Sequence, residues 1–227
     1  MNGLLMMMGG SGTRFGADRP KQFVLIDGKP LFSYLAKELS EVDSIDRFVF
    51  VSHADWTDYV DEWVGKYISK DRYQIVVGGK NRSQSVKNGL KSLQGYLKDE
   101  DVVLLHDVTH PYVDKVGIEK VISATNTYGG ATLGSRSYDT VYRIDESGFL
   151  VCTEPRDLIY AGASPEAFKY GDILKIYINA SEDELQRMTS AGAIALEYGI
   201  PMKVIETEKI NLKITHKGDL ERLYRLM

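Results

Sequence analysis

The sequence predicts an α/β fold in which helices flank a mostly parallel sheet and a β-arm projects from it. Short apolar runs rich in Val, Ile, Leu and Met are typical of strands buried on both faces, and they alternate with helical patterns. Such alternation indicates parallel strands joined by right-handed crossovers. No internal repeat or Pro/Gly/Ser-rich linker divides the 227 residues, so we expect a single domain over residues 1–227.

Strands are expected, in chain order, at Gly3–Met8, Arg47–Ser52, Gln74–Val77, Asp101–His106, Ala131–Ser135 and Met202–Ile205. Apolar residues at helical spacing, as in Leu31, Leu35 and Leu39, predict the helices between them. These helices are expected at Pro30–Val42, Asp55–Tyr67, Ser83–Leu97, Val116–Thr125, Glu166–Tyr177, Asp183–Tyr198 and Lys217–Leu226.

One stretch interrupts the alternation. Tyr138–Arg143 and Phe149–Thr153 flank a polar turn without an intervening helix, which predicts a β-hairpin at about 138–153. This β-arm is expected to be either a contact with a second subunit or a plain surface hairpin.

Composition excludes several functional classes. The chain is 43% hydrophobic and 26% charged, which is ordinary for a globular protein and unlike a disordered or fibrous one. Its 28 basic and 32 acidic side chains give a net charge of −4, so no overall basic field favours nucleic acid or anionic lipid. The apolar run Met1–Met8 is too short to span a membrane, and the single Cys152 cannot form an internal disulfide. We therefore expect a cytoplasmic protein that binds neither nucleic acid nor membrane.

A glycine-rich segment, Met8–Gly16, follows the first predicted strand. The dinucleotide-binding fingerprint requires glycine where Phe15 stands, and no Gly-Lys-Ser/Thr follows for a P-loop. Small residues let backbone N–H groups approach an anion, and Arg14 and Lys21 flank the loop. A triphosphate site and a tight turn with solvated basic residues both fit this segment by itself.

Several motifs in the same order resemble the polyol-phosphate cytidylyltransferase family, which acts on ribitol 5-phosphate or 2-C-methyl-D-erythritol 4-phosphate. The resemblance covers nearly the whole chain and implies a Rossmann-like nucleotidyltransferase domain. The matching segments are Gly9–Gly16 with Pro20–Phe23, Gly78–Val86, His106–Asp107, Asp139–Thr140, and Asn211–Thr215 with Asp219–Leu220.

The resemblance implies that a phosphate oxygen of the acceptor attacks the α-phosphate of CTP and expels pyrophosphate. A phosphate monoester is already anionic near neutral pH, so no strong general base is required. Instead the protein must align two anions and stabilise the developing charge. The residues that match the family's catalytic positions are the cations Arg14, Lys21 and Lys213, and Mg²⁺ is expected as cofactor with Asp107 as its ligand.

The remaining site residues are assigned by the same resemblance. Nucleotide binding is expected from Gly9, Gly10, Ser11, Gly12, Thr13, Gly79, Arg82, Ser85 and Asp107. Acceptor binding is expected from Asp107, His110, Thr140, Arg156, Ser164, Thr189 and Lys213. Simpler structural roles also remain open: Ser83, Ser85 or Asp107 as caps, Thr140 as a strand residue and Lys213 as a solvated charge.

Three positions on the acceptor side depart from the family pattern. His110 stands where the family has Arg, Glu166 where it has Gln, and Ser190 where it has Asp. Histidine is shorter than arginine and only partly charged near pH 7. These departures predict a different polyol phosphate or an altered affinity, while the CTP side is intact.

The string that contains Tyr160, Gly162 and Ser164-Pro165 resembles the ribitol-phosphate branch. We therefore expect CDP-ribitol as the product and a homodimer joined by the β-arm. The alternatives are 2-C-methyl-D-erythritol 4-phosphate cytidylyltransferase of isoprenoid synthesis, or an enzyme for another polyol phosphate of capsule or teichoic acid. A sugar-1-phosphate transferase that uses another nucleotide, and a non-catalytic CTP-binding protein, are further alternatives.

Overall fold

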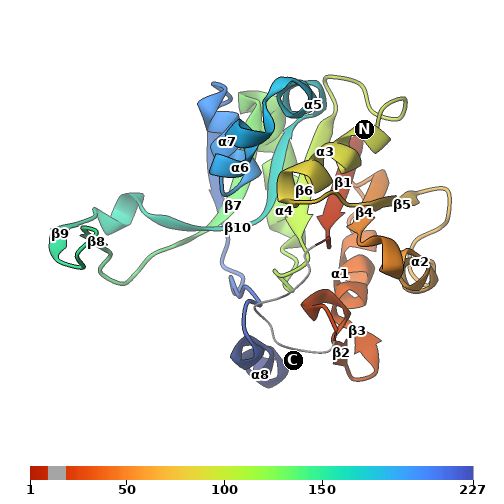
Figure 1. The fold of residues 1–227 in the computed structure, drawn as a ribbon, viewed down its shortest axis with the longest axis horizontal. Helices are drawn as coiled ribbons and strands as arrows, with labels where there is room; N and C mark the ends of the chain where they lie inside the picture. Colours follow the sequence, from red (N-terminus) through yellow and green to blue (C-terminus); the bar gives the residue numbers. More distant parts are fainter. Residues whose placement is uncertain (10–18, 227) are drawn as a thin grey trace.

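A computed structural model describes residues 1–9 and 19–226 (Figure 1). Its centre is a seven-stranded sheet in the order β11-β7-β10-β6-β1-β4-β5. The strands are β1 Asn2–Met7, β4 Arg47–Ser52, β5 Tyr73–Val77, β6 Val102–Asp107, β7 Gly130–Arg136, β10 Tyr160–Lys169 and β11 Met202–Glu206. Only β10 runs antiparallel to its neighbours β6 and β7, so the predicted mostly parallel sheet is confirmed.

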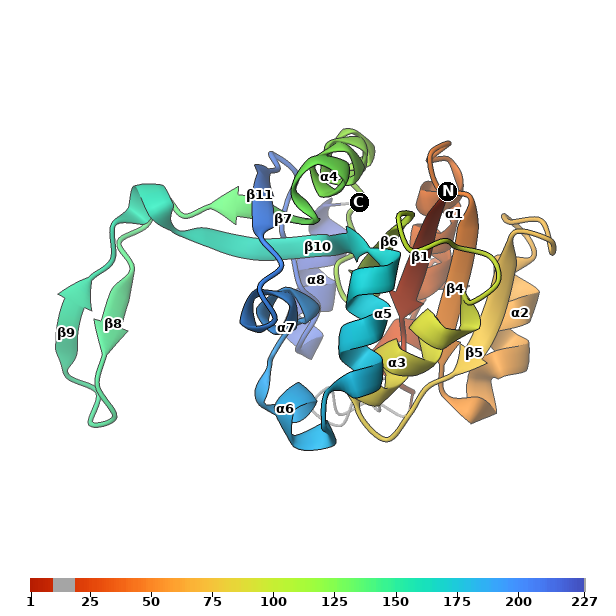
Figure 2. The ribbon, with the colours of Figure 1, turned by 90° about the horizontal axis from the view of Figure 1, so that it is seen from above.

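Helices cover both faces of this sheet (Figure 2). One face packs against α1 Leu31–Ser40, α2 Thr57–Val64 and α4 Lys115–Tyr128. The other packs against α3 Arg82–Ser92, α5 Tyr170–Asn179, α6 Glu182–Arg187 and α7 Ala191–Glu197. Side chains of β1 divide between the two cores because successive residues of a strand face opposite ways: Leu4 and Met6 join the first, Leu5 and Met7 the second. Each of these β1 side chains is at most 7% exposed, as expected of a central strand.

A third, smaller cluster joins the two ends of the chain. Ile26 and Leu31 pack with Leu212, Ile214 and Leu223. Ile26 comes from the small hairpin of β2 Leu25–Ile26 and β3 Lys29–Pro30, and Leu31 is the first residue of α1. The other three come from the segment after β11 and from α8 Lys217–Leu226. In the part of the chain that the structure describes, no helix is both long and apolar enough to cross a membrane.

Strand β10 was not predicted, and the helix expected at Glu166–Tyr177 begins instead at Tyr170. Pro165 within a run disfavours a central strand, and the small polar residues before it hide the alternation. The strand accommodates this interruption through a register shift between Ala163 and Glu166, after which Glu166 pairs with Leu105 of β6. The sheet therefore has a strand at its centre that periodicity alone does not reveal.

The single helix expected at Asp183–Tyr198 is two helices, α6 and α7. Met188 has an extended backbone, and the side chain of Ser190 caps α7 by accepting a hydrogen bond from Ala193 N at 3.0 Å. Cap residues of this kind end one helix and begin another. The break turns Thr189 and Ser190 toward a cavity at the carboxyl end of β6.

The predicted hairpin is present. β8 Tyr142–Ile144 pairs antiparallel with β9 Leu150–Thr153, and the connections to β7 and β10 hold this β-arm away from the seven-stranded sheet (Figures 1 and 2). Its strands are shorter than expected, because Tyr138–Val141 forms the connection rather than part of a strand. Its apolar side chains are strongly exposed, with Tyr138 at 78% and Phe149 at 73%.

Candidate active site

A cavity of about 460 Å³ opens at the carboxyl end of β6, which is where open α/β sheets bind their ligands. Strands β6, β7 and β10, helix α7 and the segment after β11 all contribute to its walls. Six of the predicted site residues line it: Arg82, Asp107, His110, Ser164, Thr189 and Lys213. The fold therefore gathers residues that are separated by more than a hundred positions in the sequence.

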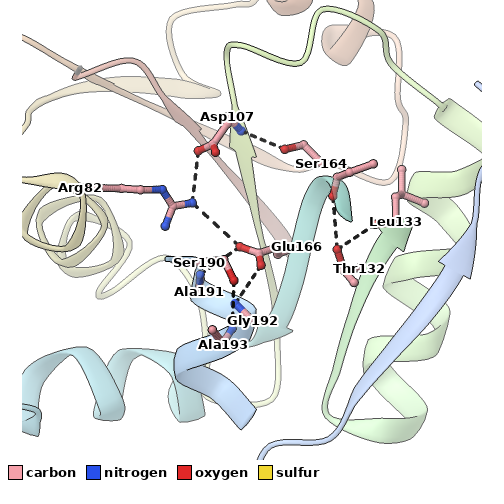
Figure 3. Close-up of polar contacts among 11 residues, drawn as sticks. Arg82, Asp107, Thr132, Leu133, Ser164, Glu166, Ser190, Ala191, Gly192 and Ala193 are labelled. Carbon is pink, nitrogen blue, oxygen red and sulfur yellow. Dashed lines mark hydrogen bonds and ion pairs between the residues drawn. The ribbon is translucent and has the colours of Figure 1, made fainter. Parts of the chain in front are cut away.

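Arg82 lies between two carboxylates in this cavity (Figure 3). Its guanidinium donates to Asp107 Oδ1 at 3.2 Å, and the same Nη2 is 3.9 Å from Glu166 Oε2. Burial works to lower the pKa of Arg82, but the neighbouring carboxylates outweigh it and raise the pKa, so the cation is retained. The sequence assigned Arg82 to nucleotide binding, and the structure adds that its guanidinium contacts Asp107 and Glu166 in the cavity.

Asp107 ends β6 and has only about a quarter of its side chain exposed. Burial would raise the pKa of its carboxyl group, but the charges of Arg82 and Lys213 more than offset this and hold the pKa below its ordinary value. Its backbone N–H lies 3.4 Å from Ser164 Oγ. Asp107 is therefore an ionised carboxylate in the cavity, close enough to Lys213 to feel its charge.

Among the three residues that depart from the family pattern, His110 is the one for which the structure most changes the expected charge. The residue is only 9% exposed, and burial together with the charges of His106 and Lys213 lowers the pKa of its imidazole to about 4. The sequence indicated a partly charged group near pH 7, but a neutral imidazole occupies this wall. A position where the family resemblance expects a permanent cation therefore carries no charge here.

The second nucleotide loop is held by its own side chains. Asn81, and not Ser83 or Ser85, caps α3 by accepting a hydrogen bond from Gln84 N at 2.8 Å. Ser85 Oγ accepts from Gly79 N at 3.0 Å and donates to Asn81 O at 2.9 Å. A Cβ on Gly79 would lie 2.0 Å from Cγ of Gln84, so this close turn requires glycine. The buried Ser85 hydroxyl thus fixes the turn.

Lys21 connects the two ends of the chain at the site. Its Nζ donates to Ile214 O at 3.0 Å, and Ile214 N donates to Thr109 O at 2.8 Å. The motif that contains Lys213 is therefore anchored beside the segment after β6. Gly9 lies two residues after β1, and a Cβ added to it would be 3.4 Å from Ser85 Oγ. Gly10, Ser11, Gly12, Thr13 and Arg14 lie outside the described residues.

Thr140 and Arg156 are not brought to the cavity. Both are exposed on the β-arm side of the molecule, and Arg156 Nη1 donates to Tyr138 O at 3.5 Å. Glu166 and Ser190, which the sequence placed on the acceptor side without naming them as binding residues, both line the cavity. Glu166 was expected in a helix, and only the register of β10 against β6 indicates that its side chain shares a face with Leu105 and Asp107.

A cavity lined by Arg82 and Lys213 at the end of a mostly parallel sheet fits a nucleotidyltransferase, and the comparisons show that the chain is one. Comparison with known proteins identifies the family: the model described as "IspD: 2-C-methyl-D-erythritol 4-phosphate cytidylyltransferase" matches residues 4–225. The chain belongs to this family, and it is a CTP-dependent cytidylyltransferase for a polyol phosphate.

Individual relatives agree with this assignment. The chain is 36% identical over 221 residues to 2-C-methyl-D-erythritol 4-phosphate cytidylyltransferase of Thermotoga neapolitana, covering 97% of this chain and 94% of that protein. The enzyme of the same name from Clostridium acetobutylicum is 35% identical with the same coverage. Among solved structures, 4-diphosphocytidyl-2C-methyl-D-erythritol synthase of Anaerococcus prevotii superposes with a TM-score of 0.82 at 25% identity, covering 100% and 99% of the two chains.

Proposed function

We propose that this enzyme transfers the cytidylyl group of CTP to 2-C-methyl-D-erythritol 4-phosphate, releasing pyrophosphate. The names of the Thermotoga and Clostridium relatives support this acceptor. The observation within the molecule that carries the proposal is the cavity in which Asp107, Ser164 and Lys213 meet beside Arg82. The preference for ribitol 5-phosphate, which rested on Tyr160 and Gly162, finds no support in these relatives.

The chemistry follows from charge. The acceptor phosphate is the nucleophile, and Lys213 is the exposed cation of the cavity that is available to pair with it. Lys21 and, by resemblance, Arg14 would stabilise negative charge on the triphosphate as pyrophosphate leaves. The cavity walls would hold the two anions in line, which makes the attack effectively unimolecular.

Mg²⁺ is the proposed cofactor, and the donor set fits it. Asp107 is ionised, and Arg82 is hydrogen-bonded to one of its two oxygens. Among residues 1–9 and 19–226 no group of three or more His, Cys, Asp or Glu side chains could hold a metal by itself. Mg²⁺ commonly takes one or two carboxylates together with substrate phosphates. When bound, it would neutralise charge on the triphosphate, with Asp107 as its protein ligand.

We further propose that the enzyme is a homodimer joined through the β-arm. The arm exposes a group of large apolar side chains: Tyr138, Tyr142, Ile144, Phe149, Leu150, Val151 and Leu158. Apolar surface of this kind on a thin projection favours burial against another protein surface. Thr140 and Arg156, which are remote from the cavity of their own subunit, would then contact the acceptor bound by the partner.

The proposal is tested by incubating the enzyme with CTP, Mg²⁺ and single acceptors, and measuring pyrophosphate release and the mass of the product. The acceptors are 2-C-methyl-D-erythritol 4-phosphate, ribitol 5-phosphate, erythritol 4-phosphate and glycerol 3-phosphate. We expect the highest kcat/KM with 2-C-methyl-D-erythritol 4-phosphate. A higher value with ribitol 5-phosphate would refute the proposed acceptor.

A second candidate is an enzyme for another polyol phosphate, which the neutral His110 favours because it removes a cation from the acceptor wall. Preference for one of the other three acceptors in the same assay would support this candidate. Silence with all four would contradict both candidates.

A further inference from the structure

Glu166 is a carboxylate at a position that would otherwise belong to an apolar core. It pairs in register with Leu105, and Phe168, two residues further along the same face of β10, is fully buried. The Glu166 side chain is only 17% exposed. Burying a charge costs free energy unless the charge is compensated, so a carboxylate here requires a reason.

Local structure compensates the charge without using all of its hydrogen-bonding capacity. Glu166 Oε1 accepts from Gly192 N at 2.9 Å, and Oε2 accepts from Ala191 N at 3.2 Å (Figure 3). In the described part of the chain these are its hydrogen bonds, one to each oxygen. A carboxylate offers about four lone-pair directions, so each oxygen can accept a further donor.

Supporting helix α7 accounts for only one lone pair on each carboxylate oxygen. Ser190 caps α7 at Ala193 N, and Glu166 satisfies the two preceding N–H groups, those of Ala191 and Gly192. Glycine at position 192 permits this close approach, because a Cβ there would lie 2.7 Å from Glu166 Oε1 and would push the carboxylate away. With Arg82 3.9 Å away on its other side, the carboxylate is held in one orientation at the cavity wall.

Charge identifies what this carboxylate can bind. Both substrates are polyanions, and a carboxylate repels phosphate, so Glu166 must face the uncharged part of a ligand. Sugar-alcohol hydroxyls are donors that suit it. The lining of this cavity includes Lys213 for the acceptor phosphate but, among the described residues, neither Gly79 nor Ser85 of the nucleotide loop. The hydroxyls at Glu166 are therefore those of the acceptor rather than those of the ribose.

We propose that Glu166 is a specificity-determining residue that accepts hydrogen bonds from the polyol hydroxyls of the acceptor. The inference rests on the proposed function, and it sets the direction of the acceptor: the phosphate lies toward Lys213 and the hydroxyl-bearing chain toward the start of α7. Beyond this carboxylate the walls from α7 and β11 are apolar, with Leu196, Met202 and Val204, so Glu166 provides polar recognition on this side together with Thr189 and Ser190.

The test is steady-state kinetics of Glu166→Gln against the same four acceptors. The amide keeps the size of the side chain but replaces one acceptor oxygen by a donor and removes the charge. Glutamine is the residue of the family pattern at this position, and its amide can donate a hydrogen bond where the carboxylate only accepts. We therefore expect the KM values of the hydroxyl-rich acceptors to change by about 10- to 100-fold relative to one another, the size of the effect of a hydrogen bond to a charged group. The KM for glycerol 3-phosphate, with its shorter chain, should change less, and the KM for CTP should stay within about 2-fold.

Two further variants separate recognition from folding. Gly192→Ala keeps the charge but displaces the carboxylate, so it should raise the same acceptor KM values without removing Glu166. Glu197→Gln makes the same charge change at an exposed position of α7 and should match the wild-type enzyme. Thermal unfolding of each variant shows whether the fold is retained.

The outcomes distinguish this inference from the proposed function. Wild-type turnover of an acceptor together with an unchanged acceptor KM in Glu166→Gln would overturn the role of Glu166 alone. Equal losses for every acceptor and for CTP would also overturn it, because they indicate a purely structural residue. If the wild-type enzyme prefers ribitol 5-phosphate and the Glu166→Gln variant loses this preference, the proposed role of Glu166 is supported and the proposed acceptor is refuted. No wild-type turnover with any acceptor would overturn both.

Discussion

The loop proposed to bind the nucleotide and the cavity proposed to bind the acceptor are built in different ways. The nucleotide loop is local: Gly79, Asn81 and Ser85 bond to one another within seven residues of sequence. The acceptor side is assembled from β6, β10, the α6–α7 connection and the segment after β11. A local loop keeps its geometry through short-range hydrogen bonds, whereas the acceptor side depends on sheet register and on compensated charges. Recognition of the acceptor can therefore change while the nucleotide loop stays the same.

The largest effect is expected from removing Lys21, one of the cations proposed to stabilise negative charge during the reaction. Lys21→Ala should lower kcat by about 10²–10³, the usual cost of removing a preorganised donor to transition-state charge. Pyrophosphate release at saturating CTP measures this. The matched control is Lys29→Ala, an exposed lysine on the neighbouring hairpin, which should retain activity. A wild-type rate in Lys21→Ala would remove Lys21 from the mechanism.

A second prediction concerns His110, the buried neutral imidazole in the wall of the cavity, and its effect on stability at low pH. Because folding lowers the pKa of His110 from 6.5 to about 4, the unfolded chain binds more protons between these values. Stability is therefore fully present above pH 6.5 and falls as the pH drops toward 4, by up to about 3 kcal/mol from this residue. Urea unfolding at pH 7 and at pH 4.5 should show a smaller loss in His110→Asn than in the wild type. An equal loss in both would mean that His110 is not buried as a neutral group.

The proposed dimer extends the comparison to the β-arm. Phe149→Ser combined with Leu150→Ser should convert the proposed dimer to a monomer, because each substitution removes exposed apolar surface. Analytical ultracentrifugation measures the change. We expect kcat/KM for the acceptor to fall about 10-fold or more as Thr140 and Arg156 are withdrawn, with little change in the KM for CTP. If the wild-type enzyme sediments as a monomer, the proposed dimer is wrong.

The smallest effect is expected in the nucleotide loop. Ser85→Ala removes the hydroxyl that bridges Gly79 N and Asn81 O, at a cost of about 1–3 kcal/mol in the stability of the loop. Calorimetry should show CTP binding weakened by about 10-fold or less, with acceptor KM unchanged. A change in acceptor KM of the same size would show that the two sides are not independent.

The sequence predicted most of the sheet because β1, β4 and β6 are continuous apolar runs that both faces bury. It missed β10 because this strand contains Gly162, Ser164 and Pro165, and its place in the sheet depends on pairing with β6 and β7 on either side. Contiguous motifs predicted Arg82, Asp107 and Lys213 at the site. The neutrality of His110 and the position of Glu166 depend on burial and on strand register, which a linear pattern does not contain.

The hydrogen bond from Lys21 to Ile214 also has a consequence for biosynthesis. It joins residues 193 positions apart, and Ile214 in turn bonds Thr109 near the middle of the chain. A ribosome synthesises the nucleotide loops long before it adds this last segment. The nascent polypeptide can thus form much of its sheet early, but the hydrogen bonds of Ile214 with Lys21 and Thr109 form only after residue 214 has left the exit tunnel.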